Sequence, residues 1–252
     1  MAPRPFFASS AVHCIMRTDW FRAHRFSCAA LLAALVCTAL SLGCSPPKAV
    51  ETCEFLIHYE RMTDRLDPLV SLAYMPPDSG VAGYRTLVIR SLDVGTQWVE
   101  QAEQAPPYLA YFRTMFAGSL AKRKVFEQVI THPDPLVLKH APGPVLNMDA
   151  RVTVFHLGSG WGRYFSYWLM FLSSAATDFQ IEARLTDADT GKLVMEFADR
   201  RRHQGNTPFG PSPKTLRNDF VMNYTIRLTA GSLAELLLRS GEGLPTDLSG
   251  PP

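Results

Sequence analysis

The chain has 252 residues, of which 47% are hydrophobic and 19% charged, and its mean hydropathy is near zero. Such values are typical of one or two soluble globular domains rather than of a chain that stays unfolded. The formal net charge is +2. Residues 1–43 carry four Arg and one Asp, so the remainder has a net charge of −1 and gives no global reason to expect a nucleic-acid partner.

The first 43 residues have the pattern of a secretory signal peptide. Residues 29–43 form an uncharged, largely apolar run that ends in small residues and follows Arg17, Arg22 and Arg25. About 15 apolar residues are too few for a membrane span, which needs about 20. The start of translation is left open between Met1 and Met16, since residues 16–43 alone make a signal of ordinary proportions.

The apolar run stops at Leu40-Ser-Leu-Gly43-Cys44, which resembles the lipobox of bacterial lipoproteins. The resemblance implies that the signal peptide is removed and that Cys44 becomes the lipid attachment site. Several acyl chains would then anchor the protein stably to a membrane. Ser45 after the cysteine resembles an outer-membrane sorting address. The alternative is an ordinary signal peptide that happens to contain a cysteine.

Cysteine use beyond residue 44 is sparse. Only Cys53 remains, so no intramolecular disulfide framework is expected. We expect an unpaired thiol there, with a mixed or interchain disulfide as the alternative.

Residues 44–83 are predicted to form a lipid tether and an N-terminal arm, with one helical turn and an extended part within residues 54–62. Residues 84–91 then predict a strand, because Leu87 to Ile89 form a continuous apolar centre. A helix is predicted over residues 106–124, where apolar side chains recur at three- and four-residue spacing. A second strand over residues 125–130 should pair with the first in parallel, since a long crossover joins them.

The second half predicts three more strands. After a proline-rich loop at residues 133–144, residues 145–155 alternate like a strand. Residues 177–203 read as a hairpin, with apolar residues at every second position on both sides of Asp187-Ala-Asp-Thr-Gly191. A helix over residues 216–239 should bury one apolar side, which comprises Phe220, Tyr224, Leu228, Leu233, Leu236 and Leu237.

Together these elements predict an α/β fold, a two-layer sandwich with a mixed sheet of about five strands and two helices on one face. The predicted domain covers residues 84–240, and residues 241–252 are predicted to be a disordered tail.

Several sequence features resemble a family. Phe55-Leu…Tyr59, Tyr84-Arg-Thr-Leu-Val-Ile, Pro142-Gly-Pro-Val-Leu146, and Glu182 to Gly191 are similar to an uncharacterised domain-of-unknown-function group of bacterial outer-membrane lipoproteins. The resemblance implies an envelope lipoprotein with a small α/β domain like the amino-terminal domain of TolB. It brings no activity and no site.

No motif predicts catalysis, a cofactor or a metal. The Asp187–Gly191 stretch lacks the glycine and glutamate positions of an EF-hand, so a hairpin turn is expected instead. Gly158-Ser-Gly-Trp-Gly162 matches neither a dinucleotide loop nor a nucleophile elbow. The histidines of the mature chain stand singly, without the spacing of metal ligands.

Two stretches are candidate contact sites. Arg200, Arg201 and Arg202, with Arg184, could form a basic edge that binds anionic groups, although charges on an edge strand also prevent aggregation. Residues 161–176 are rich in aromatic side chains and are either core or an exposed contact. The candidate contact residues in this stretch are Trp161, Tyr164, Trp168 and Phe171.

These features predict a non-enzymatic lipoprotein of the cell envelope. We expect it in the outer membrane, facing the periplasm, held by lipidated Cys44 and contacting an envelope protein. The alternative is a carrier whose 161–176 segment lines a pocket for an apolar ligand. A third hypothesis is a hydrolase whose active site is formed by residues far apart in the sequence.

Overall fold

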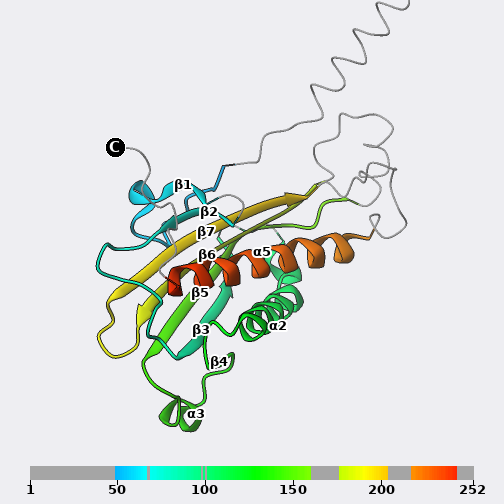
Figure 1. The fold of residues 1–252 in the computed structure, drawn as a ribbon. Helices are drawn as coiled ribbons and strands as arrows, with labels where there is room; N and C mark the ends of the chain where they lie inside the picture. Colours follow the sequence, from blue (N-terminus) through cyan, green and yellow to red (C-terminus); the bar gives the residue numbers. More distant parts are fainter. Residues whose placement is uncertain are drawn as a thin grey trace, which may run out of the picture. The chain divides into compact units, whose positions relative to one another are not determined.

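The computed structural model describes residues 49–66, 69–97, 99, 101–159, 176–203 and 217–242. These residues form a seven-stranded sheet in the order β1-β2-β7-β6-β5-β3-β4 (Figure 1). The strands are β1 (Thr63–Leu66), β2 (Val70–Tyr74), β3 (Thr86–Val94), β4 (Gln128–Ile130), β5 (Val145–His156), β6 (Thr177–Asp187) and β7 (Leu193–His203). The helices are α2 (Pro106–Arg123), α3 (Pro135–Lys139) and α5 (Asn218–Gly241), with short 3-10 turns at Tyr59–Arg61 and Ala102–Gln104.

The sheet is mixed, as predicted. Strands β5, β6 and β7 pair antiparallel, and β6 and β7 form the expected hairpin. Strand β3 pairs in parallel with both β4 and β5. The predicted parallel pair joined by a helix is therefore confirmed as β3–α2–β4, and a right-handed crossover over one face is the usual geometry of such a unit.

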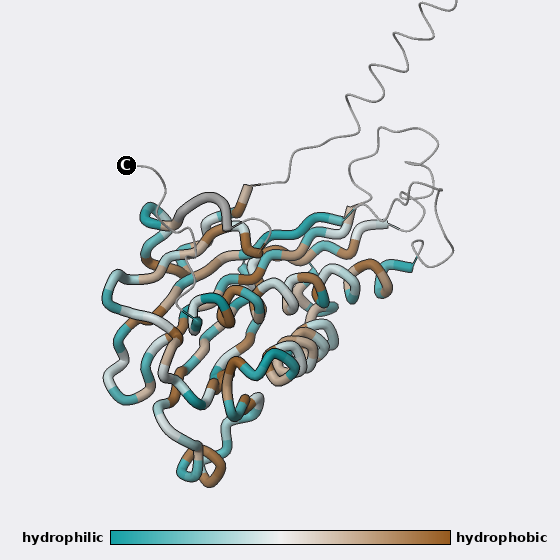
Figure 2. The backbone as a smooth tube through the Cα atoms, in the orientation of Figure 1, coloured by the Kyte–Doolittle hydropathy of each residue, from teal (hydrophilic) through white to brown (hydrophobic). Residues whose placement is uncertain are grey.

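Helices α2 and α5 cover one face of the sheet and pack against each other (Figure 1). Apolar and polar residues alternate along the strands in Figure 2, and the apolar ones on this face make the core. Phe179, Ile181, Ala183 and Leu185 of β6 are all fully buried, which confirms the predicted apolar row. From α2, the buried residues are Leu109, Phe112, Phe116 and Leu120.

The predicted count of five strands is too low. Strands β1 and β2 lie in the segment predicted as tether and arm, and β2 pairs antiparallel with β7 through Leu72↔Ala198. The predicted boundary at residue 84 therefore leaves two strands out of the sheet. Both strands are short, and four or five residues give too little alternation to separate a strand from an extended arm. The proline-rich loop likewise contains the five-residue helix α3.

Helix α5 matches the predicted range, but its buried side is partly different. Phe220 and Leu228 are exposed, whereas Leu233, Leu236 and Leu237 are buried as expected. Apolar residues occur on more than one side of this helix, because it contacts both the sheet and α2, so spacing alone does not fix the buried side. None of the helices in the described ranges has the length and apolar character needed to cross a membrane.

Candidate functional site

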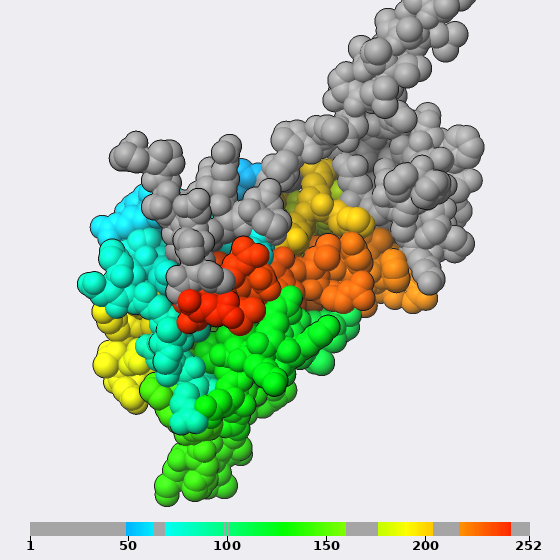
Figure 3. Space-filling view, in the orientation of Figure 1, coloured from blue at the N-terminus to red at the C-terminus, as the bar shows by residue number. Residues whose placement is uncertain are grey.

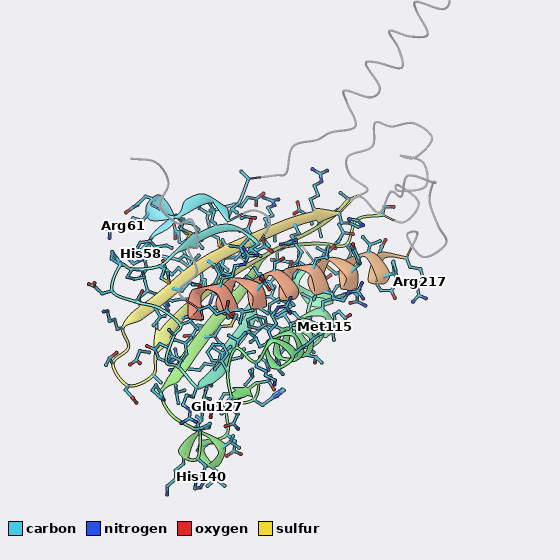
Figure 4. The ribbon with its side chains drawn as sticks, in the orientation of Figure 1. His58, Arg61, Met115, Glu127, His140 and Arg217 are labelled. Carbon is cyan, nitrogen blue, oxygen red and sulfur yellow. The ribbon has the colours of Figure 1, made fainter. Side chains whose placement is uncertain are left out.

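The second face of the sheet carries a buried polar cluster beneath residues 49–62, here called the N-terminal strap. Gln180, Glu182, Glu196 and Arg200 point to this face from β6 and β7, and each is almost fully buried. Alternation along a strand would leave such side chains in water. The strap covers them instead, and Figure 4 labels two of its residues, His58 and Arg61, at the β1–β2 edge of the sheet.

Glu182 is the acceptor at the centre of this cluster. Its carboxylate accepts hydrogen bonds from Cys53 Sγ at 2.9 Å and from Tyr59 Oη, both in the strap. Within the sheet, Gln180 Nε2 donates to it at 2.8 Å and Thr153 Oγ1 at 3.3 Å. A buried carboxylate without such donors would be strongly destabilising, so these bonds hold the strap in place.

The cluster suppresses ionisation of both strap donors. Cys53 is a free, buried cysteine. Burial and then the neighbouring Glu182 raise the pKa of its thiol to about 11. Burial and the same carboxylate also raise the pKa of the Tyr59 hydroxyl. The thiol is thus a neutral hydrogen-bond donor at physiological pH, not a nucleophile.

Glu196 binds the middle of the strap. Its Oε2 lies 2.9 Å from His58 Nδ1 and accepts the backbone N–H of His58 at 3.1 Å. The backbone N–H of Ile57 donates to Oε1 at 3.3 Å. The His58 ring also stacks on Tyr74 of β2, with the ring centroids 4.8 Å apart. These contacts join the strap to strands β2 and β7.

Arg200 ties down the start of the strap. Its guanidinium pairs with Asp178 at 3.0 and 2.8 Å, and donates to Glu51 Oε1 at 2.8 Å and to the Ala49 carbonyl at 2.9 Å. Burial alone would lower its pKa, but the hydrogen bonds to Asp178 and Glu51 outweigh burial and raise it. Residue 49 is therefore already fixed to the folded domain.

The expected basic edge is not open to a partner at Arg200 and Arg201, because both guanidinium groups are engaged inside the domain. Strand β7 pairs with β2 through Glu196 to Ala198 and with β6 along its length, so Arg200 to Arg202 lie past its pairing with β2. Arg201 turns to the helix side, where it donates to Asp199 at 2.8 Å and to Ser232 at 2.9 Å, and Arg202 also has an interaction partner. The guanidinium of Arg184 lies 6.0 Å from the Phe55 ring centroid in the strap. Arg200 and Arg201 thus serve internal pairing.

The Asp187–Gly191 stretch is the hairpin turn that the sequence predicts. Asp187 Oδ1 accepts the Thr190 N–H at 2.7 Å, and Gly191 has a positive φ of 68°. The Thr190 hydroxyl and N–H, with Tyr84, lower the pKa of Asp187. Beside this turn an open pocket of about 460 Å³ is lined by both polar and apolar residues, including Tyr84, Lys192 and Val194.

The exposed surface that sequence reasoning missed is on α3. Leu136, Val137 and Leu138 are 72%, 42% and 39% exposed, and we call them the apolar tip. The tip projects from the rest of the described residues in Figures 1 and 3, at the α3 label of Figure 1. The run Pro-Leu-Val-Leu in the sequence is its only local signal.

Other predicted site residues lie outside the described ranges. These are the lipid attachment site Cys44 and the aromatic residues Trp161, Tyr164, Trp168 and Phe171. Within the described residues, no group of three or more His, Cys, Asp or Glu side chains is placed to hold a metal ion.

No protein-family model matches the chain. No curated protein matches its sequence either. Among solved structures, it is similar to a PelC dodecamer subunit from Paraburkholderia phytofirmans, at 13% identity and a TM-score of 0.39, over 64% of this chain and 96% of that one.

Two further solved structures are similar. Protein XCC0632 from Xanthomonas campestris, assigned to the family DUF330, has 11% identity and a TM-score of 0.41, over 67% of this chain and 92% of that one. A putative neuraminyllactose-binding hemagglutinin homolog from Helicobacter pylori has 10% identity and a TM-score of 0.34, over 70% and 98%. The structures similar to this chain thus include uncharacterised bacterial proteins. At TM-scores below 0.5 these similarities carry no weight for function.

Proposed function

We propose that this chain is a lipid-anchored protein of the bacterial cell envelope, and that it acts as a non-enzymatic interaction module. The proposed anchor is a diacylglycerol on Cys44, and the proposed place is the periplasmic side of the outer membrane. The lipobox-like Leu40–Cys44 stretch after a signal-like run supports the anchor.

The observation that carries the proposal is the attachment of Ala49 and Glu51 to buried Arg200. Only Ser45-Pro-Pro-Lys48 separates Cys44 from this fixed point. Five peptide steps span at most about 18 Å. A lipid on Cys44 would therefore hold the domain close to the membrane surface, where it could contact other envelope proteins.

The buried polar cluster supports a structural rather than a catalytic role. The carboxylates of Glu182 and Glu196 accept hydrogen bonds from the strap and lie beneath it. The thiol of Cys53 is held neutral by burial and by Glu182, which raise its pKa to about 11. A nucleophile or general base needs the opposite arrangement, with access to substrate and a pKa near the working pH. The same groups instead stabilise the segment that leads to the anchor.

Metabolic labelling of cells with radioactive palmitate tests the anchor. We expect label in the wild-type protein and in a Cys53→Ser variant, and none in a Cys44→Ala variant. Cys53→Ser is the matched control because it removes the other cysteine of the mature chain. Label that survives Cys44→Ala, or an unlabelled wild-type protein in the aqueous fraction, would contradict the proposal.

A further inference from the structure

The apolar tip is exposed although its side chains are among the most hydrophobic on the surface. Leu136 alone is 72% exposed, and Val137 and Leu138 follow it directly. Scattered exposed aliphatic residues are normal on soluble proteins, but a contiguous group on a projection marks a contact site. In Figure 3 the loop that carries the tip stands out from the neighbouring surface.

The tip is built rigidly rather than left as a loose loop. Asp134 caps α3, with its carboxylate accepting the Leu136 N–H at 2.7 Å. Pro135 occupies the first helical turn, where its fixed φ suits a helix. A five-residue helix is not stable alone in water, so the cap and the prolines are needed to hold the aliphatic side chains outward. Preorganisation of this kind lowers the entropic cost of binding.

The base of the loop is attached firmly to strand β3. Thr86 Oγ1 donates to the Pro142 carbonyl at 2.8 Å, and the Arg85 N–H donates to the Pro144 carbonyl at 3.0 Å. The Arg85 side chain packs directly on Gly143, leaving no room for a Cβ atom there. The tip therefore has a defined position relative to the sheet.

We propose that the apolar tip docks into an apolar groove with an acidic rim on another envelope protein. The groove would receive Leu136, Val137 and Leu138, which lie within one turn of α3. The acidic rim follows from charge. Lys139 is the one permanent cation of residues 131–144, while the one carboxylate, Asp134, is occupied as the helix cap. The proposal deepens the interaction role proposed above and rests on that role.

Chain length favours a protein over the anchoring bilayer as the occupant. The side chain of Arg200 binds Ala49. In the register of the sheet, Arg200 lies opposite Gln180 and Gln180 lies opposite Val154. The tip precedes Val145, nine residues from Val154 along β5, which is about 30 Å at 3.3 Å per residue. Figure 4 shows His140, next to the tip, beyond the β4 edge of the sheet and His58 and Arg61 at the β1 edge, so the tip and the strap are also separated across the strands. With β5 upright on a bilayer that the tip enters, Ala49 would lie about 30 Å above that surface, beyond the reach of about 18 Å from Cys44.

The experiment is photo-crosslinking in intact cells with the full-length chain. A photoreactive amino acid replaces Val137, and the control places it at Asp189, which is exposed on the β6–β7 turn. We expect one protein adduct from position 137 and none from position 189. Its yield should fall at least tenfold with Leu136→Ser and Leu138→Ser together, fall with Lys139→Glu, and persist with Lys139→Arg. Unchanged melting curves by circular dichroism would show that these variants fold.

Four outcomes would overturn the inference, and palmitate labelling separates it from the proposed anchor. An adduct heavier by the mass of one lipid would place the tip in a bilayer, and an adduct of twice the chain mass would make a second copy the occupant. An adduct yield that is unchanged by the serine substitutions, or no adduct above the position 189 background, would contradict the docking role. Palmitate on Cys44 without a tip adduct leaves the anchor standing alone. A protein adduct without palmitate leaves the tip standing and removes the anchor.

Discussion

The Cys53 thiol lies 2.9 Å from Oε1 of Glu182, a residue 129 positions later in the chain. The contact joins the N-terminal strap to the centre of the sheet on the face opposite the helices. Both side chains are buried, and the hydrogen bond requires the thiol to keep its proton.

Alkylation of Cys53 should be slow in the folded protein. Because burial and Glu182 raise the pKa of the thiol from 9.0 to about 11, its thiolate fraction at pH 8 falls about 100-fold. We expect iodoacetamide to modify Cys53 at least about 100-fold faster in urea than in native buffer. Mass spectrometry of the peptide that contains Cys53 measures both rates. Rapid labelling without denaturant would mean that the strap leaves the sheet readily.

Stability should fall at alkaline pH. The folded state holds the Cys53 proton up to about pH 11, whereas the unfolded state loses it near pH 9.0. The contribution is therefore complete below pH 9.0 and is lost as the pH rises towards about 11. The raised pKa of Tyr59 acts in the same direction. The free energy of unfolding, measured from urea curves at each pH, should fall less steeply with pH for Cys53→Ser than for wild type. Equal slopes against pH would argue against the effect.

Two glycines with positive φ should differ in their tolerance of alanine. Gly191 has a φ of 68° and open space around it, so Gly191→Ala should cost about 1 kcal/mol from backbone strain alone. Gly143 has a φ of 61°, and a Cβ there would lie 2.3 Å from Cδ of Arg85. Gly143→Ala should therefore cost more than Gly191→Ala, as measured by chemical denaturation. Equal costs would show that Arg85 moves away freely.

Removal of a buried cation should cost more than removal of an exposed one. Arg200 has 3% of its side chain exposed and pairs with Asp178, which is 8% exposed. Arg200→Ala should cost about 3–5 kcal/mol, because it leaves a buried carboxylate without its cation. The control Arg217→Ala removes a pair whose side chains are 70% and 47% exposed, and should cost under about 1 kcal/mol. Denaturant midpoints compare the two, and a similar loss in both would contradict the burial of the pair.

The core could be predicted from the sequence because its signals are local. Phe179 to Leu185 keep a strict two-residue period, and Asp187 to Gly191 have the chemistry of a tight turn, so both the strands and the turn are confirmed. Phe112, Phe116 and Leu120 repeat every four residues, which identifies the buried side of α2. Where near neighbours in the sequence set the environment of a side chain, the periodicity of apolar residues is sufficient to predict whether it is buried.

The strap and the apolar tip could not be predicted in this way. Alternation assigns Gln180, Glu182 and Glu196 to solvent, and no local pattern records that residues more than 120 positions earlier cover them. The helix of the tip could not be predicted because one turn is too short to show a helical period, while its prolines indicate a loop.

The bond between Arg200 and Ala49 spans 151 positions of the chain. Ala49 to His58 are synthesised early, yet their partners on β6 and β7 emerge only after most of the polypeptide has been made. Contacts of such large sequence separation form slowly, since the entropy of closing a long loop is lost before the contacts stabilise the fold. The segment that begins at Ala49 therefore cannot dock until β7 has been made, and we expect its contacts with the sheet to form late in folding.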